Sequence, residues 1–190
     1  MTERKRLTAR DWTAAALAAL ARGGIAAVGV EPIAASLGAT KGSFYWHFSN
    51  REALLEAALA EWERIDTEEV IALVEAEPDV RRRLRLLLTV AVGGHDGSPG
   101  ERVELALQPT ASHPLVAPVL ARVSARRLDY LTAQFTALGF PPAQARQRSL
   151  LAYTAYLGHA QLAHATPQAT PSGDALPAYV DFVISTLSAR

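Results

Sequence analysis

The chain has 190 residues, 49% of them hydrophobic, and its 19 Lys and Arg balance 19 Asp and Glu. These values describe a globular protein, either one moderate domain or a small head fused to a larger body, and they exclude a disordered chain. The chain has no cysteine, which excludes disulfides, thiolate metal sites and a thiol nucleophile. No apolar stretch reaches the roughly 20 residues that cross a membrane, and no signal peptide is recognisable, so we expect a cytoplasmic protein.

Abundant alanine and leucine, turn residues between apolar segments and the lack of strand-like alternation predict an all-α fold. Thr8 and Asp11 form a capping box at the start of the first helix, and Ser49 and Glu52 form another at the start of the fourth. Gly23-Gly24 ends the first helix. About nine helices are expected, at 8–22, 31–37, 40–48, 49–75, 79–92, 101–107, 115–138, 142–165 and 175–188, with loops at 93–100 and 166–174.

Two short helices joined at Gly38 have the spacing of a helix-turn-helix. In the second of them Phe44 and Phe48 are four residues apart, so they share the face that packs on the first helix. The opposite face would enter the major groove of DNA, and it carries Gly42, Ser43, Trp46 and His47. An aromatic core made of residues 45–47 is the alternative, although three consecutive helical side chains cannot all point inward.

Charge is distributed unevenly along a chain whose net charge is zero. Residues 1–51 carry seven Lys and Arg against three acids, whereas residues 52–79 carry ten acids against one base. DNA binding requires positive charge only where the phosphates lie. A basic head beside an acidic segment fits that requirement, and chance clustering on solvated faces explains the counts equally well.

Residues 33–55 resemble the signature of the tetracycline-repressor (TetR) family. They contain Ile33-Ala34, a glycine in the turn, Lys41-Gly42, the run Tyr45-Trp46-His47-Phe48 and a base before Leu54-Leu55. The likeness covers roughly residues 8–60 and departs at residue 51, where arginine replaces the more frequent lysine. Both residues are cations, so phosphate contact should survive.

The resemblance implies a DNA-binding domain at 1–50 and a ligand-binding and dimerisation domain at 51–190. It implies phosphate contacts from Tyr45, His47 and Arg51, and places Thr40, Lys41, Ser43 and Trp46 nearest the bases or their sugars. The expected DNA-binding set is Thr40, Lys41, Gly42, Ser43, Tyr45, Trp46, His47 and Arg51.

The same resemblance implies a homodimeric repressor that a small molecule releases from a palindromic operator in double-stranded DNA. The candidate lining residues of its pocket, given below, suggest that this molecule is apolar or aromatic. A helical sensor or carrier without DNA binding is one alternative. An activator, or a DNA-organising member of the same family, is another.

The body of the chain carries no motif. The resemblance implies that its helices at 142–165 and 175–188 pair with their copies in a second chain and that a pocket lies between the central helices; apolar residues at helical spacing give the candidates for both. Candidates for a ligand pocket are Trp62, Leu88, Leu105, Gln108, Leu128, Leu131, Phe135 and Tyr156. Candidates for the contact with a second copy are Leu150, Leu151, Tyr153, Leu157, Tyr179, Phe182, Val183 and Leu187. Plain core packing is the alternative for both sets. We expect Arg81-Arg82-Arg83 and Arg126-Arg127 on solvated faces.

No chemistry-bearing motif suggests catalysis or a cofactor. The five histidines lack the spacing of metal ligands, and no nucleophile elbow, P-loop or Rossmann glycine pattern is present. We therefore expect no metal, no cofactor and no enzymatic activity.

Overall fold

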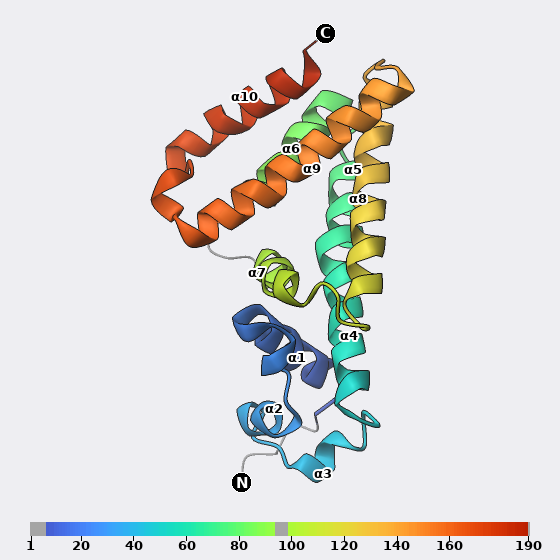
Figure 1. Ribbon diagram of the computed structural model, residues 1–190, viewed down its shortest axis with the longest axis vertical. Helices are drawn as coiled ribbons and strands as arrows, with labels where there is room; N and C mark the ends of the chain where they lie inside the picture. Colours follow the sequence, from blue (N-terminus) through green and yellow to red (C-terminus); the bar gives the residue numbers. More distant parts are fainter. Residues whose placement is uncertain (1–6, 94–98, 190) are drawn as a thin grey trace. The chain divides into compact units, whose positions relative to one another are not determined.

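A computed structural model describes residues 7–93 and 99–189, and every regular element in these two ranges is helical (Figure 1). This confirms the predicted all-α class. The helices are α1 (Ala9–Gly23), α2 (Val30–Ser36), α3 (Lys41–Phe44), α4 (Arg51–Glu63), α5 (Val70–Glu75), α6 (Val80–Gly93), α7 (Pro99–Leu107), α8 (Ala117–Ala137), α9 (Pro142–Ala165) and α10 (Leu176–Ser188).

A π-helical segment, Arg64–Glu69, joins α4 to α5 without a break. The helical run therefore extends from Arg51 to Glu75, as the sequence predicts. Short 3₁₀ turns occupy Gly24–Ala27, Gln108–Thr110, Pro167–Ala169 and Gly173–Ala175. Most of the loop predicted at 93–100 lies outside the described residues.

Two predicted helix ends are confirmed and one needs correction. Thr8 and Asp11 form the expected capping box, and Gly24 ends α1 at φ +62°. The cap of α4 is Asn50 and not Ser49, since Asn50 Oδ1 accepts a 2.8 Å hydrogen bond from the Ala53 amide. An asparagine side chain caps a helix as well as a serine does, so the sequence did not distinguish the two neighbours.

Contacts divide the described chain into two compact units. The head unit consists of Met1–Arg64 and Arg102–Leu120, and the body unit consists of Ile65–Glu101 and Ala121–Arg190. Residues 51–64 join the head because Leu54, Leu55 and Leu59 of α4 are fully buried there and α4 packs on α1. The predicted boundary after residue 50 separates a DNA-binding domain from a ligand-binding domain by function, and it stays a prediction.

The head unit has an aromatic core and one tight backbone approach. Trp12 of α1 and Phe44 of α3 are fully buried, with their rings edge to face at 5.5 Å. At Gly24 an added Cβ would lie 2.8 Å from the Ala106 carbonyl oxygen. The positive φ and this close approach both require glycine.

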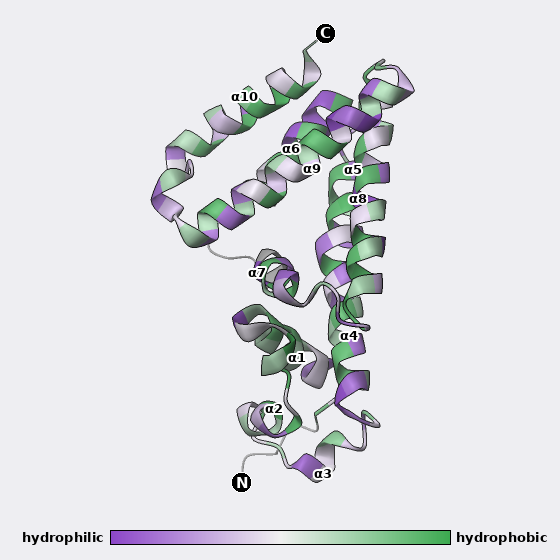
Figure 2. Cartoon of the chain, in the orientation of Figure 1, coloured by the Kyte–Doolittle hydropathy of each residue, from purple (hydrophilic) through white to green (hydrophobic). Residues whose placement is uncertain are grey.

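The body unit has a second core, centred on α8. Fully buried Phe135 packs edge to face on Phe140 at 6.2 Å, and the same cluster includes Leu84, Leu131, Ala145, Tyr153 and Leu187. Along α9, hydrophobic and hydrophilic residues are interspersed (Figure 2). Some apolar side chains of α9 and α10 are therefore left outside this core.

Candidate nucleic-acid interface and ligand cavity

The turn between α2 and α3 forms because the sequence provides the residues it needs. Gly38 adopts φ +61°, and the Ala39 amide donates to the Ala34 carbonyl at 2.8 Å. Thr40 then caps α3, since its Oγ1 accepts a hydrogen bond from the Ser43 amide at 3.2 Å. This geometry is that of the predicted helix-turn-helix.

The aromatic residues of the α3 region separate into an inner and an outer set. Phe44 is fully buried and stacks on Phe48 at 5.7 Å, so these two anchor the segment. Trp46 is 88% exposed and Tyr45 is 56% exposed, so the alternative of an aromatic core made of residues 45–47 is wrong. The exposed surface beside them carries Thr40, Lys41 and Gly42, with Ser43 and His47 half-buried.

A hollow of about 360 Å³ lies in this part of the head unit. It brings together three of the predicted DNA-binding residues, Lys41, Tyr45 and Arg51, with Ser49 and Asn50 at the N-terminus of α4. The free amides at a helix N-terminus and the nearby bases attract phosphate. The hollow therefore combines donors and positive charge next to the exposed aromatic side chains.

One acid also lines the hollow. Lys41 Nζ lies 2.8 Å from Glu31 Oε1, and both side chains are exposed. The hydrogen bond, and then the opposite charge, lowers the pKa of Glu31 and raises the pKa of Lys41. Both groups are charged at neutral pH, so Glu31 offsets part of the positive charge that Lys41 brings.

Arg51 has a structural contact that the sequence did not reveal. Its Nε donates to the Val28 carbonyl at 2.6 Å, and its Nη2 donates to the Ile25 carbonyl at 2.5 Å. These bonds fasten the start of α4 to the segment that precedes α2. The phosphate contact of Arg51 stays a prediction. Whether or not it is made, Arg51 holds the backbone of the head in place through these two bonds.

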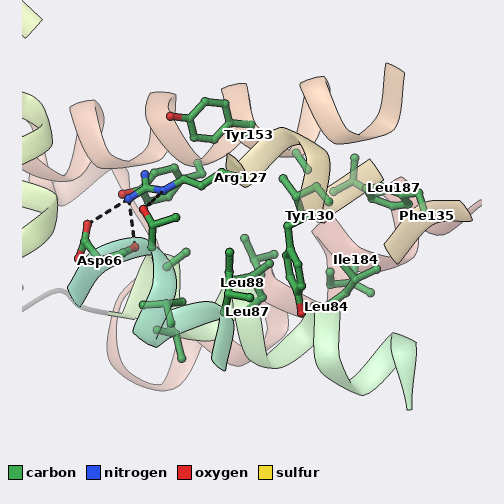
Figure 3. A pocket seen from close by; sticks show the side chains of 18 of the residues that line it. Asp66, Leu84, Leu87, Leu88, Arg127, Tyr130, Phe135, Tyr153, Ile184 and Leu187 are labelled. Carbon is green, nitrogen blue, oxygen red and sulfur yellow. Dashed lines mark hydrogen bonds and ion pairs between the residues drawn. The ribbon is translucent and has the colours of Figure 1, made fainter. Parts of the chain in front are cut away.

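The body unit contains an apolar cavity of about 260 Å³ (Figure 3). Four of the eight predicted pocket residues line it, namely Leu88, Leu131, Phe135 and Tyr156. Leu128 packs against the adjacent core cluster instead. Trp62, Leu105 and Gln108 lie in the head unit and do not line this cavity, because helical spacing shows a buried face but not which core it joins.

Arg127 is also part of the cavity wall, which corrects its expected place on a solvated face. Its side chain is 13% exposed. Its Nε donates to Thr67 Oγ1 at 3.0 Å and its Nη2 to the Asp66 carbonyl at 3.1 Å, with Asp66 Oδ2 at 3.3 Å. Its guanidinium also lies 5.9 Å from the centre of the Tyr156 ring.

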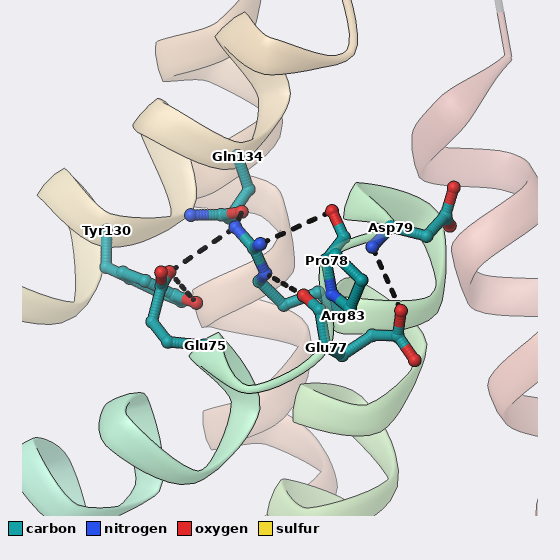
Figure 4. Close-up of polar contacts among 7 residues, drawn as sticks. All are labelled: Glu75, Glu77, Pro78, Asp79, Arg83, Tyr130 and Gln134. Carbon is teal, nitrogen blue, oxygen red and sulfur yellow. Dashed lines mark hydrogen bonds and ion pairs between the residues drawn. The ribbon is translucent and has the colours of Figure 1, made fainter.

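Arg83 is a second arginine that the sequence placed wrongly in solvent. It is 16% exposed and donates to Gln134 Oε1 at 3.1 Å and to the Glu77 carbonyl at 2.8 Å (Figure 4). Tyr130 donates to Glu75 at 2.8 Å in the same network, and burial, followed by that bond, raises the pKa of Tyr130 well above its usual range. The network ties the turn between α5 and α6 to α8.

The residues predicted to contact a second copy are divided between surface and core. Leu150, Leu151 and Phe182 are more than half exposed, and Leu157, Tyr179 and Val183 are half-buried. Tyr153 and Leu187 belong to the body core and line the cavity, so they cannot form an exposed contact surface. The first six residues remain a predicted interface.

No group of three or more His, Asp or Glu side chains in the described chain is placed to hold a metal ion. Among the described helices, none combines the length and apolar character needed to span a membrane.

The fold and the exposed α3 region define a helix-turn-helix DNA-binding protein with a helical second unit. The sequence profile described as "Bacterial regulatory proteins, tetR family" matches residues 13–58, which contain the helix-turn-helix. This segment is therefore similar to the DNA-binding domain of the tetR-family regulatory proteins, in agreement with the resemblance seen in the sequence. A comparison of the sequence with curated proteins gave no match.

Solved structures share the fold over nearly the whole chain. A transcriptional regulator from Rhodococcus sp. Rha1 aligns with a TM-score of 0.78 at 21% identity, over 95% of this chain and 96% of that one. FadR from Bacillus subtilis, solved with stearoyl-CoA, aligns at 0.69 and 17% identity over 95% and 97%. AibR, solved with isovaleryl coenzyme A and operator DNA, aligns at 0.68 and 19% identity over 97% of each chain. At these identities the likeness concerns the fold.

Proposed function

We propose that this protein is a homodimeric repressor that binds a palindromic operator through the exposed surface of α3 and is released by a small, mainly apolar molecule. The observation that carries the DNA assignment is the outward position of Trp46 and Tyr45 on a segment whose inner side is fixed by Phe44. Such a regulator acts in the cytoplasm, where it meets its operator.

Each DNA-binding residue receives a role from its position. Thr40, Ser43 and Trp46 lie near the start of α3 or follow it, where a helix-turn-helix protein reads base edges and sugars. Tyr45, His47 and Arg51 contact phosphates, which sets affinity more than sequence preference. Lys41, which the resemblance places nearest the bases or their sugars, lines the same hollow as Tyr45 and Arg51 and so also reaches a phosphate. Gly42 has open space around it, since an added Cβ would meet nothing closer than Thr40 Oγ1 at 3.8 Å, and DNA backbone can approach there.

A second copy of the chain provides the second head. Helix-turn-helix dimers read two half-sites about one helical turn apart, or a multiple of it. Leu150, Leu151 and Phe182 leave large apolar side chains exposed on α9 and α10 of one unit, which supports a contact between copies through these helices.

The ligand occupies the cavity of the body unit. Its volume of about 260 Å³ and its apolar lining support a small hydrophobic molecule. The acyl-CoA complexes of FadR and AibR support a ligand site in a body of this fold. Such a ligand releases DNA only if it binds the DNA-free state more tightly than the DNA-bound state.

Fluorescence anisotropy on DNA from upstream of the protein's own gene, beside an unrelated duplex, tests this function. A salt-sensitive affinity that favours the upstream DNA is expected, because phosphate contacts give the salt dependence and base contacts give the preference. The absence of any salt-dependent affinity for either duplex would argue against DNA binding by the head. A reporter gene then separates repressor from activator, since loss of a repressor raises transcription.

A further inference from the structure

The cavity of the body unit has one polar end. Among the described residues that line it, Arg127 is the only base and Asp66 the only acid. Both lie at one end, and Phe135, Ile184 and Leu187 lie at the other (Figure 3). A molecule that fills such a cavity has an apolar part and a polar group that meets Arg127.

The ion pair at the polar end is half-buried, and the contact between its charged groups is long. Asp66 and Arg127 are 17% and 13% exposed, and Arg127 Nη2 lies 3.3 Å from Asp66 Oδ2. Strong bonds between a guanidinium and a carboxylate measure about 2.7–2.9 Å and often come in parallel pairs. The exposed pair of Arg85 with Asp181 does form two such bonds, at 2.5 and 2.9 Å. A carboxylate entering the cavity could therefore form better bonds with Arg127 than Asp66 does.

The partner of Arg127 belongs to an unusual backbone segment. Asp66 and Thr67 lie in the π-helical segment Arg64–Glu69, and Arg127 bonds the carbonyl of the first and the hydroxyl of the second. Single π-helical turns within α-helices are rare and are frequent at functional sites. The segment directly follows α4 in the chain. Its backbone and one of its side chains are therefore held in part by Arg127.

We propose that Arg127 binds the carboxylate of a small organic acid with an apolar tail, and that this acid takes the place of Asp66. The exchange keeps Arg127 neutralised inside the body, which a buried guanidinium requires. It leaves Asp66 without its partner, so the π-helical segment must rearrange to return that carboxylate to water. A neutral ligand would leave the pair in place and could not cause this change.

The cavity also limits the size of the acid. An apolar cavity of about 150 Å³ accommodates one benzene molecule, so about 260 Å³ corresponds to about ten non-hydrogen atoms. Octanoate has this size, and octanol is its match without the carboxylate. This inference rests on the proposed function, because it names the chemistry of the ligand that the cavity takes.

The test is isothermal titration of the full chain with octanoate and with octanol. Wild type is expected to bind octanoate at least about tenfold more tightly than octanol, as one charge-assisted bond provides. Arg127→Gln should abolish that preference. Asp66→Asn should bind octanoate more tightly than wild type, a gain that misfolding cannot produce. Arg126→Gln is the matched control, since Arg126 pairs with Glu68 and does not line the cavity.

Four results would overturn the proposal. The first three are equal affinity for acid and alcohol, an octanoate affinity that Arg127→Gln leaves unchanged, and no binding of octanoate up to its solubility. The fourth is tighter binding of octanoyl-CoA than of octanoate, undiminished in Arg127→Gln.

Anisotropy on the upstream DNA in the presence of octanoate separates this proposal from the proposed function. Binding that depends on Arg127 without any effect on DNA affinity supports the carboxylate site and refutes ligand control. DNA release by octanol or octanoyl-CoA that is unchanged in Arg127→Gln supports ligand control and refutes the carboxylate site.

Discussion

Arg51→Met tests whether the arginine that replaces the family's more frequent lysine holds the head together. The substitution keeps most of the apolar stem and removes the bonds to the carbonyls of Val28 and Ile25. A hydrogen bond from a charged donor contributes about 1.5–3 kcal/mol when buried. The side chain of Arg51 is about one third exposed, so water replaces part of that value. We expect the free energy of unfolding of the head to fall by about 2 kcal/mol.

Tryptophan fluorescence measures this change selectively. All three tryptophans, Trp12, Trp46 and Trp62, lie in the head unit. Urea unfolding followed at these residues therefore reports the head, and a lower midpoint with an unchanged slope is the expected result. Arg51→Lys should recover part of the loss, because one ammonium group reaches one carbonyl but does not form the two bonds of the guanidinium.

The same variants separate the structural role from phosphate contact. Removing one phosphate contact lowers the slope of log affinity against log salt by about one. Arg51→Met should show this decrease, whereas Arg51→Lys should keep the slope because it keeps the charge. The control is Arg22→Met, which removes an exposed arginine of α1. If Arg51→Met unfolded at the same urea concentration as wild type and this control, the structural role of Arg51 would be refuted.

Three further changes test other parts of the structure. Glu31→Gln should strengthen binding to any duplex and steepen the salt slope, because it frees Lys41 for phosphate. In wild type, protonation of Glu31 should strengthen DNA binding in the same way only as the pH falls through the lowered pKa of Glu31. Stronger DNA binding of wild type caused by a pH change near neutrality would contradict this role of Glu31. Gly24→Ala should lower the free energy of unfolding by about 1–3 kcal/mol or more, since it combines positive φ with a clash. Gly38→Ala has a similar φ and no atom within 4 Å of the added Cβ, so an equal loss in urea unfolding would refute the role of the clash. Phe182→Asp should convert the proposed dimer to monomer in light scattering, and a dimer of unchanged affinity would place the interface elsewhere.

The sequence predicted the head well because its interactions are local. Its main features are a pair of residues four apart on one helix, a glycine at a turn and a threonine that caps a helix. Each of these acts within a few positions of the chain. Spacing alone therefore placed Phe44 inside and Trp46 outside. The prediction of Ser49 as the cap of α4 was wrong because the neighbouring Asn50 suits the position equally well.

The body was predicted less well because its decisive contacts join distant residues. Arg127 meets Thr67 across 60 positions, and Arg83 meets Gln134 across 51. An arginine on a helix is exposed unless a partner compensates its burial, and no pattern in one sequence identifies such a partner. The same limit explains why Tyr153 and Leu187, chosen for a surface, lie in the core.

Hydroxyl-radical footprinting of the full chain on the upstream DNA tests the central claim, that two α3 surfaces read one operator, most directly. We expect two protected half-sites of inverted sequence, with centres about one helical turn of 10–10.5 base pairs apart or a multiple of it. Both footprints should weaken together in Trp46→Ala, because the Trp46 side chain is 88% exposed on that surface. A single protected half-site, or a pair that Trp46→Ala leaves intact, would contradict the reading of one operator by two α3 surfaces.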